Sequence, residues 1–194
     1  SYGYFTWKTR DWEIRQWLEE FLAPQVTEYH RGNMFANTPD ILHEFLQTGG
    51  RAAFRLRLLL AGTLSPLYGI YSGYELCEHQ PVRHGSEEYL DSEKYQIRAR
   101  DYAAPGNLDE DIRLLNRIRR AERALQRQDN LTFHATDNAN ILFYRRAAVD
   151  GSADLLVAVN LDPHAPHHTT VEVPIAALGL GDDDWYEVED LLSG

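Results

Sequence analysis

The chain has 194 residues, enough for one large domain or one and a half small ones. Its 30 acidic and 19 basic residues give a formal net charge of −11, which disfavours nucleic acid and anionic membrane surfaces as partners. Cys77 is the single cysteine, so no intrachain disulfide can form, and a reducing compartment is expected. No apolar run approaches the roughly 20 residues that span a bilayer.

The first part of the chain predicts a strand, a helix and a second strand. Aromatic and β-branched residues at 2–7 are typical of a strand. Thr9 is a candidate N-cap for an amphipathic helix over residues 10–22, which Pro24 ends. A short apolar run at 34–36 then indicates a buried strand.

A buried helix, a further strand and a long loop follow. Residues 51–64 are apolar around most of the helical circumference, which predicts a helix inside the core. Residues 67–71 are continuously apolar, as in a parallel strand covered on both faces. Residues 77–107 lack periodicity but are rich in aromatic and charged side chains, which favours an ordered functional loop.

The last part of the chain changes character. Residues 109–127 have the pattern of a long amphipathic helix. Short strand-like runs separated by turn residues come next, at 131–133, 141–144, 155–159 and 169–173. Strand–helix repeats followed by short strands predict an α/β domain over 1–128 and the first part of an antiparallel β domain over 129–194. Because both ends fall inside patterned sequence, we expect a fragment of a longer protein.

Asp40 is the first candidate functional residue. It follows the strand at 34–36 through a turn that contains Pro39, whose ring fixes its own φ and restricts Thr38. In parallel α/β folds, functional side chains gather just beyond the carboxyl ends of the strands. The alternative is a structural role, in which Asp40 is the N-cap of a helix over residues 41–46.

Two motifs carry a resemblance to the α-amylase superfamily. Residues 71–75, Tyr-Ser-Gly-Tyr-Glu, resemble the Tyr-x-Gly-x-Glu signature that closes the eighth strand of the family barrel. Residues 37–40, Asn-Thr-Pro-Asp, stand where the family has Asn-His-Asp after strand 7, with one residue more between Asn and Asp. The resemblance implies strands and helices about 6 to 8 of a (β/α)8 barrel, followed by part of an antiparallel β domain.

The extra residue in the motif at residues 37–40 narrows the resemblance to one branch of the α-amylase superfamily. Together with residues 1–7, 71–78, 88–95 and 187–192, it is similar to the α-1,4-glucan:maltose-1-phosphate maltosyltransferases of bacterial α-glucan synthesis. The resemblance covers essentially the whole chain. It implies transfer of a maltosyl unit from α-maltose 1-phosphate to the non-reducing end of an α-1,4-glucan by a cytoplasmic homodimer that needs no cofactor.

The resemblance assigns roles to three residues. Retention of configuration needs a carboxylate nucleophile and a carboxylic acid, which the family places after strands 4 and 5. Asp40 matches a third carboxylate, which stabilises the transition state, and Lys94 and Tyr95 match a substrate-binding pair. We expect the nucleophile, the acid, the residues that hold the donor phosphate and the rest of the barrel to come from upstream sequence or another chain.

Several alternatives stay open at this point. Another α-amylase-type hydrolase or a trehalose-forming isomerase fits the same motifs, and a noncatalytic carbohydrate-binding or interaction module is the alternative of another class. The alternative for Lys94 and Tyr95 is a structural role, in which Lys94 is a solvated loop lysine and Tyr95 a packing residue. Tyr4 and Trp7 are interpreted either as lining a cleft or as core residues.

The remaining candidates are interpreted as structural. Glu75 is expected to be held by an ion pair or by backbone hydrogen bonds, with Arg51 and Arg55 as candidate partners. Cys77 has no recognisable Cys–His pattern around it. The histidines and the run of aspartates near the end lack the spacing of zinc or calcium sites and are expected to be solvated turns: His164, His167, His168, Asp182, Asp183 and Asp184.

Overall fold

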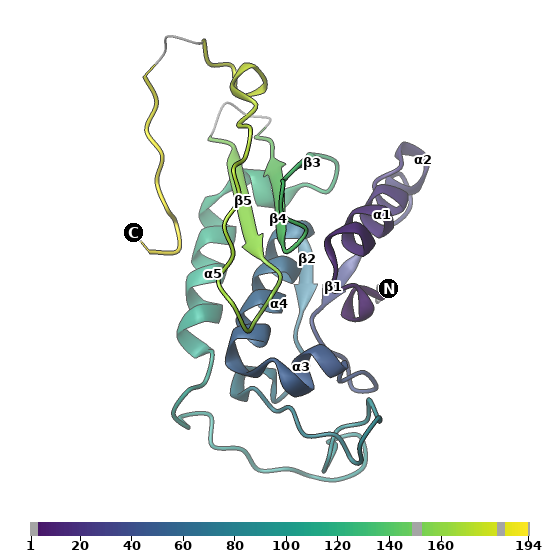
Figure 1. The fold of residues 1–194 in the computed structure, drawn as a ribbon. Helices are drawn as coiled ribbons and strands as arrows, with labels where there is room; N and C mark the ends of the chain where they lie inside the picture. The colour runs from purple at the N-terminus through teal and green to yellow at the C-terminus, as the bar shows by residue number, and fades with distance from the viewer. Residues whose placement is uncertain (1–3, 149–152, 182–184, 194) are drawn as a thin grey trace.

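A computed structural model describes residues 4–148, 153–181 and 185–193. Helix α4 (Gly50–Leu64) occupies the centre. It contacts the short parallel strands β1 (Asn33–Phe35) and β2 (Leu67–Gly69), helix α5 (Asp109–Ala121) and strand β5 (Leu155–Asn160). Figure 1 shows these elements around α4, with the loop of residues 77–107 folded across one end of the molecule. No helix among the described residues is long and apolar enough to cross a membrane.

A β–α–β unit forms the part of the fold around α4. Strands β1 (Asn33–Phe35) and β2 (Leu67–Gly69) pair in parallel, and the connection between them runs through α3 (Glu44–Thr48) and α4. Parallel neighbours require such a crossover, so the two predicted strands and the predicted buried helix are confirmed. Leu67 is 48% exposed among the described residues, so the expected cover on both faces of β2 stays a prediction.

The strand predicted at residues 2–7 is wrong for the residues that the structure describes. Tyr4–Trp7 form a 3₁₀ helix, η1. The reason is a tertiary contact: the buried guanidinium of Arg57, on α4, donates to the carbonyl oxygens of Phe5 and Lys8 and lies over the Phe5 ring. Local β propensity is a weak preference that such contacts readily override.

Helix α1 (Asp11–Phe21) confirms the predicted amphipathic helix but not its cap. The carboxylate of Glu13 accepts hydrogen bonds from the backbone N–H groups of Thr9 and Arg10, at 3.2 and 3.1 Å. Thr9 is therefore held by the helix rather than capping it. Pro24 is the first residue of the short helix α2 (Pro24–Thr27), a position where its missing N–H has no cost.

Helix α5 (Asp109–Ala121) ends before the predicted residue 127. Glu122 adopts extended backbone, and a 3₁₀ turn, η3 (Arg123–Gln126), follows. The buried Leu115 packs against α4 at Gly62, where a Cβ atom would lie 2.6 Å from Leu115 Cδ2. The two helices therefore approach closely because this position has no side chain.

An antiparallel sheet follows, in the order β3 (Leu131–His134), β4 (Ile141–Arg146) and β5 (Leu155–Asn160). These three strands confirm the predicted change to β structure. The strand predicted at 169–173 is wrong, since Val171 makes only an isolated bridge with Thr136. That segment is held instead by side chains, with Asn138 Nδ2 donating to the His168 carbonyl at 3.1 Å.

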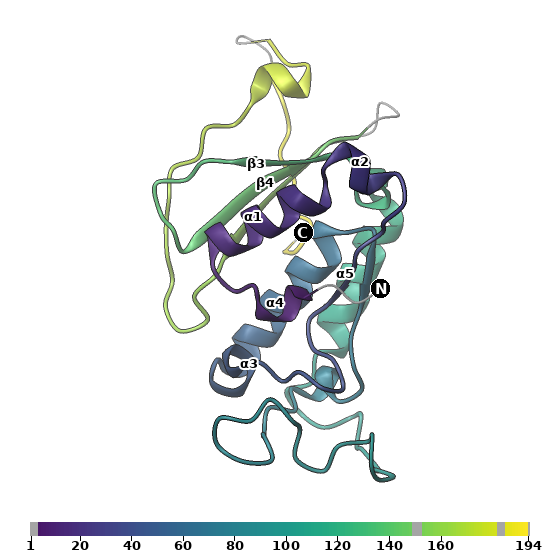
Figure 2. The same ribbon diagram turned by 90° about the vertical axis from the view of Figure 1, so that its right-hand side faces the viewer.

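The sheet shares one hydrophobic core with the α/β part. Tyr144 is hydrogen-bonded to Thr63 of α4 at 2.5 Å, and the fully buried Arg146 donates to the Leu64 carbonyl at 3.0 Å. Strand β5 contacts α4, and Figure 2 shows the sheet and this helix from a second direction. The expected order, α/β followed by antiparallel β, is confirmed at this level, and the domain boundary at 128/129 stays a prediction.

Candidate functional site

A buried amide joins the carboxyl ends of both parallel strands to the long loop. Asn37, two residues beyond β1, accepts a hydrogen bond from the Tyr71 N–H at 2.9 Å, just beyond β2. Its Nδ2 donates to the hydroxyl of Tyr89, in the loop, at 2.6 Å. Asn37 is fully buried and Tyr89 is nearly so. The loop of residues 77–107 is thereby fixed over the strand ends.

Asp40 lies on a short turn three residues further on. Backbone hydrogen bonds of 3.2 Å between Thr38 and Ile41 close this turn, and the Asp40 N–H donates to Thr38 Oγ1 at 3.3 Å. Helix α3 begins later, and its N-cap is His43, whose Nδ1 accepts from the Phe45 N–H. The alternative in which Asp40 caps a helix over 41–46 is therefore wrong.

The structure brings the three predicted site residues together. The ammonium of Lys94 contacts Oδ1 of Asp40, although 54 residues separate them in sequence, and lies 5.1 Å from the centre of the Tyr95 ring. The Lys94 side chain is 21% exposed, whereas the Asp40 side chain is 70% exposed. Proximity does not test their assigned roles, which stay predictions.

Sequence reasoning did not single out Glu88, which completes this group. Its Oε2 lies 3.0 Å from Lys94 Nζ, so the ammonium bridges two carboxylates. The hydrogen bond to Asp40, with a further one to Glu88, raises the pKa of Lys94 above its ordinary value. Lys94 is therefore a fixed positive charge across the physiological pH range. The available signal was its position at the start of the 88–95 segment.

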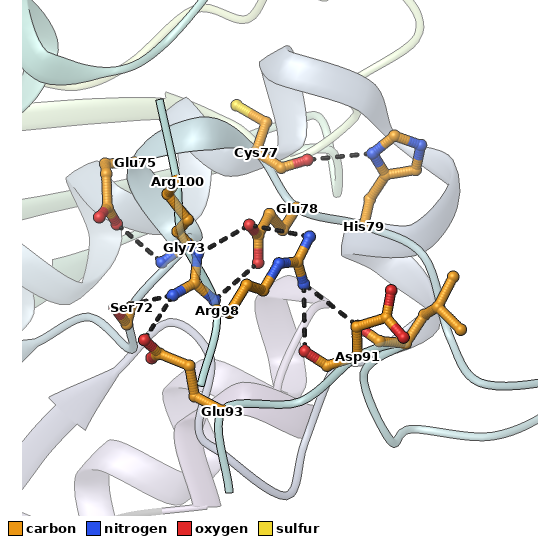
Figure 3. Close-up of polar contacts among 11 residues, drawn as sticks. Ser72, Gly73, Glu75, Cys77, Glu78, His79, Asp91, Glu93, Arg98 and Arg100 are labelled. Carbon is orange, nitrogen blue, oxygen red and sulfur yellow. Dashed lines mark hydrogen bonds and ion pairs between the residues drawn. The ribbon is translucent and has the colours of Figure 1, made fainter. Parts of the chain in front are cut away.

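A second cluster of charges anchors the loop beside this group (Figure 3). Arg100 donates to both oxygens of Glu78, at 2.8 and 3.1 Å, and forms an ion pair of 2.6 Å with Glu93. Arg98 also contributes, with its Nη2 3.2 Å from Glu78 Oε1. These pairs join residues on either side of Lys94 and Tyr95, and none was predicted from the sequence.

Gly73 is required by this cluster. Its φ of +93° is a conformation that other residues rarely adopt, and a Cβ atom there would lie 2.2 Å from Glu78 Oε2. The Gly73 N–H donates to Glu75 Oε2 at 3.1 Å. The structural interpretation of Glu75 through backbone hydrogen bonding therefore agrees with the geometry.

The partners proposed for Glu75 are wrong. Arg51 and Arg55 both contact the carboxylate of Asp111 on α5, at 2.5 and 2.7 Å. These arginines lie on α4, and they connect that helix to α5 rather than to the turn after β2. Sequence spacing alone does not reveal which acidic residue folds back against α4.

The structure gives Cys77 and Trp7, two further residues considered in the sequence, structural roles. Burial raises the pKa of the Cys77 thiol to about 11, so it is protonated at neutral pH and unsuited to act as a nucleophile. The indole N–H of Trp7 donates to the carboxylate of Glu87 at 3.0 Å, which ties η1 to the loop. The side chain of Tyr4 lies outside the described residues.

The described residues contain no group of three His, Cys, Asp or Glu side chains that could hold a metal ion. His167 Nε2 instead pairs with Asp162 at 2.8 Å, and Asn140 lies 3.5 Å from its other ring nitrogen. The aspartates at 182–184 lie outside the described residues.

The comparisons with known proteins agree in pointing to one family. A family model described as "GLGE, C-terminal" matches residues 133–194. Over its full length the chain is 48% identical to the α-1,4-glucan:maltose-1-phosphate maltosyltransferase of Myxococcus xanthus and 50% identical to maltosyltransferase 2 of Streptomyces coelicolor. It is 43% identical to the maltosyltransferase of Mycobacterium tuberculosis.

The resemblance to the maltosyltransferases is confirmed. The chain spans 29% of the length of the Myxococcus and Streptomyces maltosyltransferases and 28% of the Mycobacterium one, so it corresponds to a segment of them. Among solved structures, a γ-CGTase from an alkalophilic Bacillus clarkii matches with a TM-score of 0.52 and 18% identity. That match covers 79% of this chain and 21% of the CGTase, and it supports the fold alone.

Proposed function

We propose that the protein carrying this chain is a retaining glycosyltransferase that moves maltosyl units from α-maltose 1-phosphate to the non-reducing ends of α-1,4-glucans. The observation that carries this proposal is the identity of 43–50% to maltosyltransferases along the whole chain. The group formed by Asp40, Lys94 and Tyr95 supports it, because these are the residues that the resemblance assigns to the sugar.

In this proposal β1 and β2 are strands 7 and 8 of a (β/α)8 barrel, with residues 1–128 in the barrel and 129–194 in the C-terminal β domain. Their parallel pairing through α4 and the position of Asp40 just past the end of β1 support it. Functional residues of such barrels lie at this end of the strands. The remaining strands, the nucleophile, the general acid and the phosphate-binding residues would come from outside this chain.

Asp40 would act on the reacting sugar as a hydrogen-bond acceptor. Cleavage of the glycosidic bond develops positive charge on the ring oxygen and the anomeric carbon, which a nearby carboxylate stabilises. Lys94 contacts one oxygen of the Asp40 carboxylate, and the largely exposed side chain leaves room for sugar hydroxyls to donate to the group. The same contact orients the carboxylate, so part of the ordering is complete before substrate binds.

Lys94 and Tyr95 would bind the sugar from the loop. An ammonium carries three donors, and Asp40 and Glu88 account for two directions, so a hydroxyl of the donor sugar can take the third. The exposed Tyr95 ring offers a face for the apolar side of a glucose ring. On the resemblance alone, we propose in addition a cytoplasmic homodimer.

The decisive experiment assays the whole protein with α-maltose 1-phosphate and a short α-glucan. Phosphate release coupled to glucan growth is expected. Maltose formation from starch without phosphate release would instead indicate a hydrolase and refute the proposal. An Asp40→Asn variant should lose turnover by about 10³-fold, since an amide cannot supply the carboxylate charge. Its thermal unfolding midpoint should fall only slightly, because an ion pair with a largely exposed carboxylate contributes about 1 kcal/mol or less.

A further inference from the structure

We propose that Arg100 is a positioning residue that holds the Lys94–Tyr95 segment in its substrate-binding geometry. This inference rests on the proposed function, in which that pair binds the donor sugar. Arg100 lies on the return half of the long loop, and its polar side-chain partners among the described residues are Glu78, Ser72 and Glu93 rather than Lys94 or Asp40. Its effect would be exerted through Glu93, the residue before Lys94 (Figure 3).

The burial and charge of Arg100 set it apart from the other loop arginines. Its side chain is 3% exposed, and its guanidinium faces two carboxylates, Glu78 and Glu93. The hydrogen bonds to Glu78, the largest cause, and to Glu93 raise its pKa above the ordinary value, so it is always charged. A guanidinium fork that bonds both oxygens of one carboxylate has a fixed orientation, which a single ammonium cannot reproduce.

One side of Arg100 is anchored to the β2 end of the fold. The Glu78 carboxylate that it bonds lies against Gly73, so closely that any side chain at that position would collide with it. Arg100 Nη1 also approaches Ser72 Oγ at 3.4 Å. The guanidinium is therefore tied to the turn that follows β2, which the core holds in place through the buried Tyr74.

The other side of Arg100 reaches the substrate-binding segment. Glu93 pairs with Arg100 at 2.6 Å, and the next two residues form a turn on Ser92, whose Oγ accepts from the Lys94 N–H and whose carbonyl accepts from the Tyr95 N–H. The ammonium of Lys94 is held at its far end by Asp40 and Glu88. The Lys94–Tyr95 segment is thus held at two points. Arg100 holds Glu93, the residue before it, and Asp40 and Glu88 hold the Lys94 ammonium.

Removing Arg100 would leave two carboxylates without their main counter-charge: Glu78, whose side chain is 14% exposed, and Glu93, whose side chain is 32% exposed. Glu78 would retain Arg98 at 3.2 Å, whereas Glu93 would lose the partner that orients it. Loss of one partner is costly for the largely buried Arg100–Glu78 pair, so the local structure is expected to rearrange. The turn on Ser92 is the nearest element that can move, and Lys94 moves with it.

The first test compares Arg100→Met with Arg113→Met in the whole protein. Arg113 forms an Nε–carboxylate contact of the same 2.8 Å, with Asp109, but its side chain is 69% exposed and both partners lie on α5. Arg100→Met should raise the KM for α-maltose 1-phosphate by about tenfold or more, as a displaced binding group does. Arg113→Met should change neither KM nor kcat.

A double-mutant cycle then separates positioning from general stability. If Arg100 acts through Lys94, Arg100→Met should have little further effect on donor KM once Lys94→Met is present. Fully additive effects of the two substitutions would overturn the proposal. If Arg100→Met fails to fold, Glu93→Gln replaces it in the cycle, because that change removes only the pair nearest to Lys94.

An activity-independent measurement distinguishes failure of this inference from failure of the proposed function. Amide hydrogen exchange without substrate should accelerate at residues 93–97 in Arg100→Met and remain unchanged there in Arg113→Met. Unchanged exchange in both variants would refute the positioning role, whatever reaction the protein catalyses. Accelerated exchange in a protein that releases no phosphate from α-maltose 1-phosphate would support the positioning role and reject the proposed substrate.

Discussion

The buried amide of Asn37 offers the sharpest test of how the site is assembled. Asn37→Ala removes the acceptor of the Tyr71 N–H at 2.9 Å and the donor to the Tyr89 hydroxyl at 2.6 Å. A buried hydrogen bond contributes about 1 kcal/mol net, and a buried N–H left without an acceptor costs about 1–3 kcal/mol. Together these losses predict a destabilisation of about 2–4 kcal/mol.

Urea unfolding of the whole protein measures this loss as a lower transition midpoint with an unchanged slope. Tyr89→Phe leaves the buried Asn37 Nδ2 without its acceptor and should lose about 1–3 kcal/mol, less than Asn37→Ala, and Tyr102→Phe, at an exposed position, should lose none. Turnover should fall in Asn37→Ala as well, because Asp40 lies three residues away on the same turn.

A stability within 0.5 kcal/mol of the parent for Asn37→Ala would refute the reasoning. It would mean that the amide does not join the strand ends to the loop. An equal loss in Asn37→Ala and Tyr89→Phe would contradict it in part, since the Tyr71 N–H would then contribute nothing.

Two further predictions concern the charged groups of the loop. Gly73→Ala should lower the free energy of unfolding by about 2 kcal/mol or more, because it adds a collision with Glu78 to backbone strain. Gly85→Ala, at φ +75° with no atom within 4 Å of the added Cβ, should show the strain alone. Thermal unfolding compares the two variants, and equal losses would contradict the collision. The pKa of Lys94 is raised from 10.5, so the stability from its ion pairs is fully present below about pH 10.5 and is lost as the pH rises through the folded-state pKa. The donor-KM defect of Lys94→Met should therefore be constant from about pH 6 to 9, and a defect that disappears within that range would show that Lys94 titrates there.

The elements that sequence determined are those whose signal is local. The helical spacing of Ile14, Trp17 and Leu18 sets the buried face of α1, and the apolar circumference of residues 51–64 sets the central position of α4. These patterns depend on the 3.6-residue period of the helix, which places the apolar residues on one face whatever core that face packs against. The motif around Asp40 likewise identified a carboxylate just past a strand, because a proline turn after a short apolar run has few other conformations.

What only the tertiary structure decided depends on partners that are distant in sequence. Arg57 folds the apparent strand before Lys8 into a 3₁₀ helix, and Glu88 joins Lys94 and Asp40 although no pattern singles it out. Arg100 pairs with Glu78 and Glu93, while Asp111 takes the arginines of α4. Many acidic and basic residues of the chain have the charges to form an ion pair, so a sequence lists the possible pairs, and the burial and geometry of the folded chain select among them.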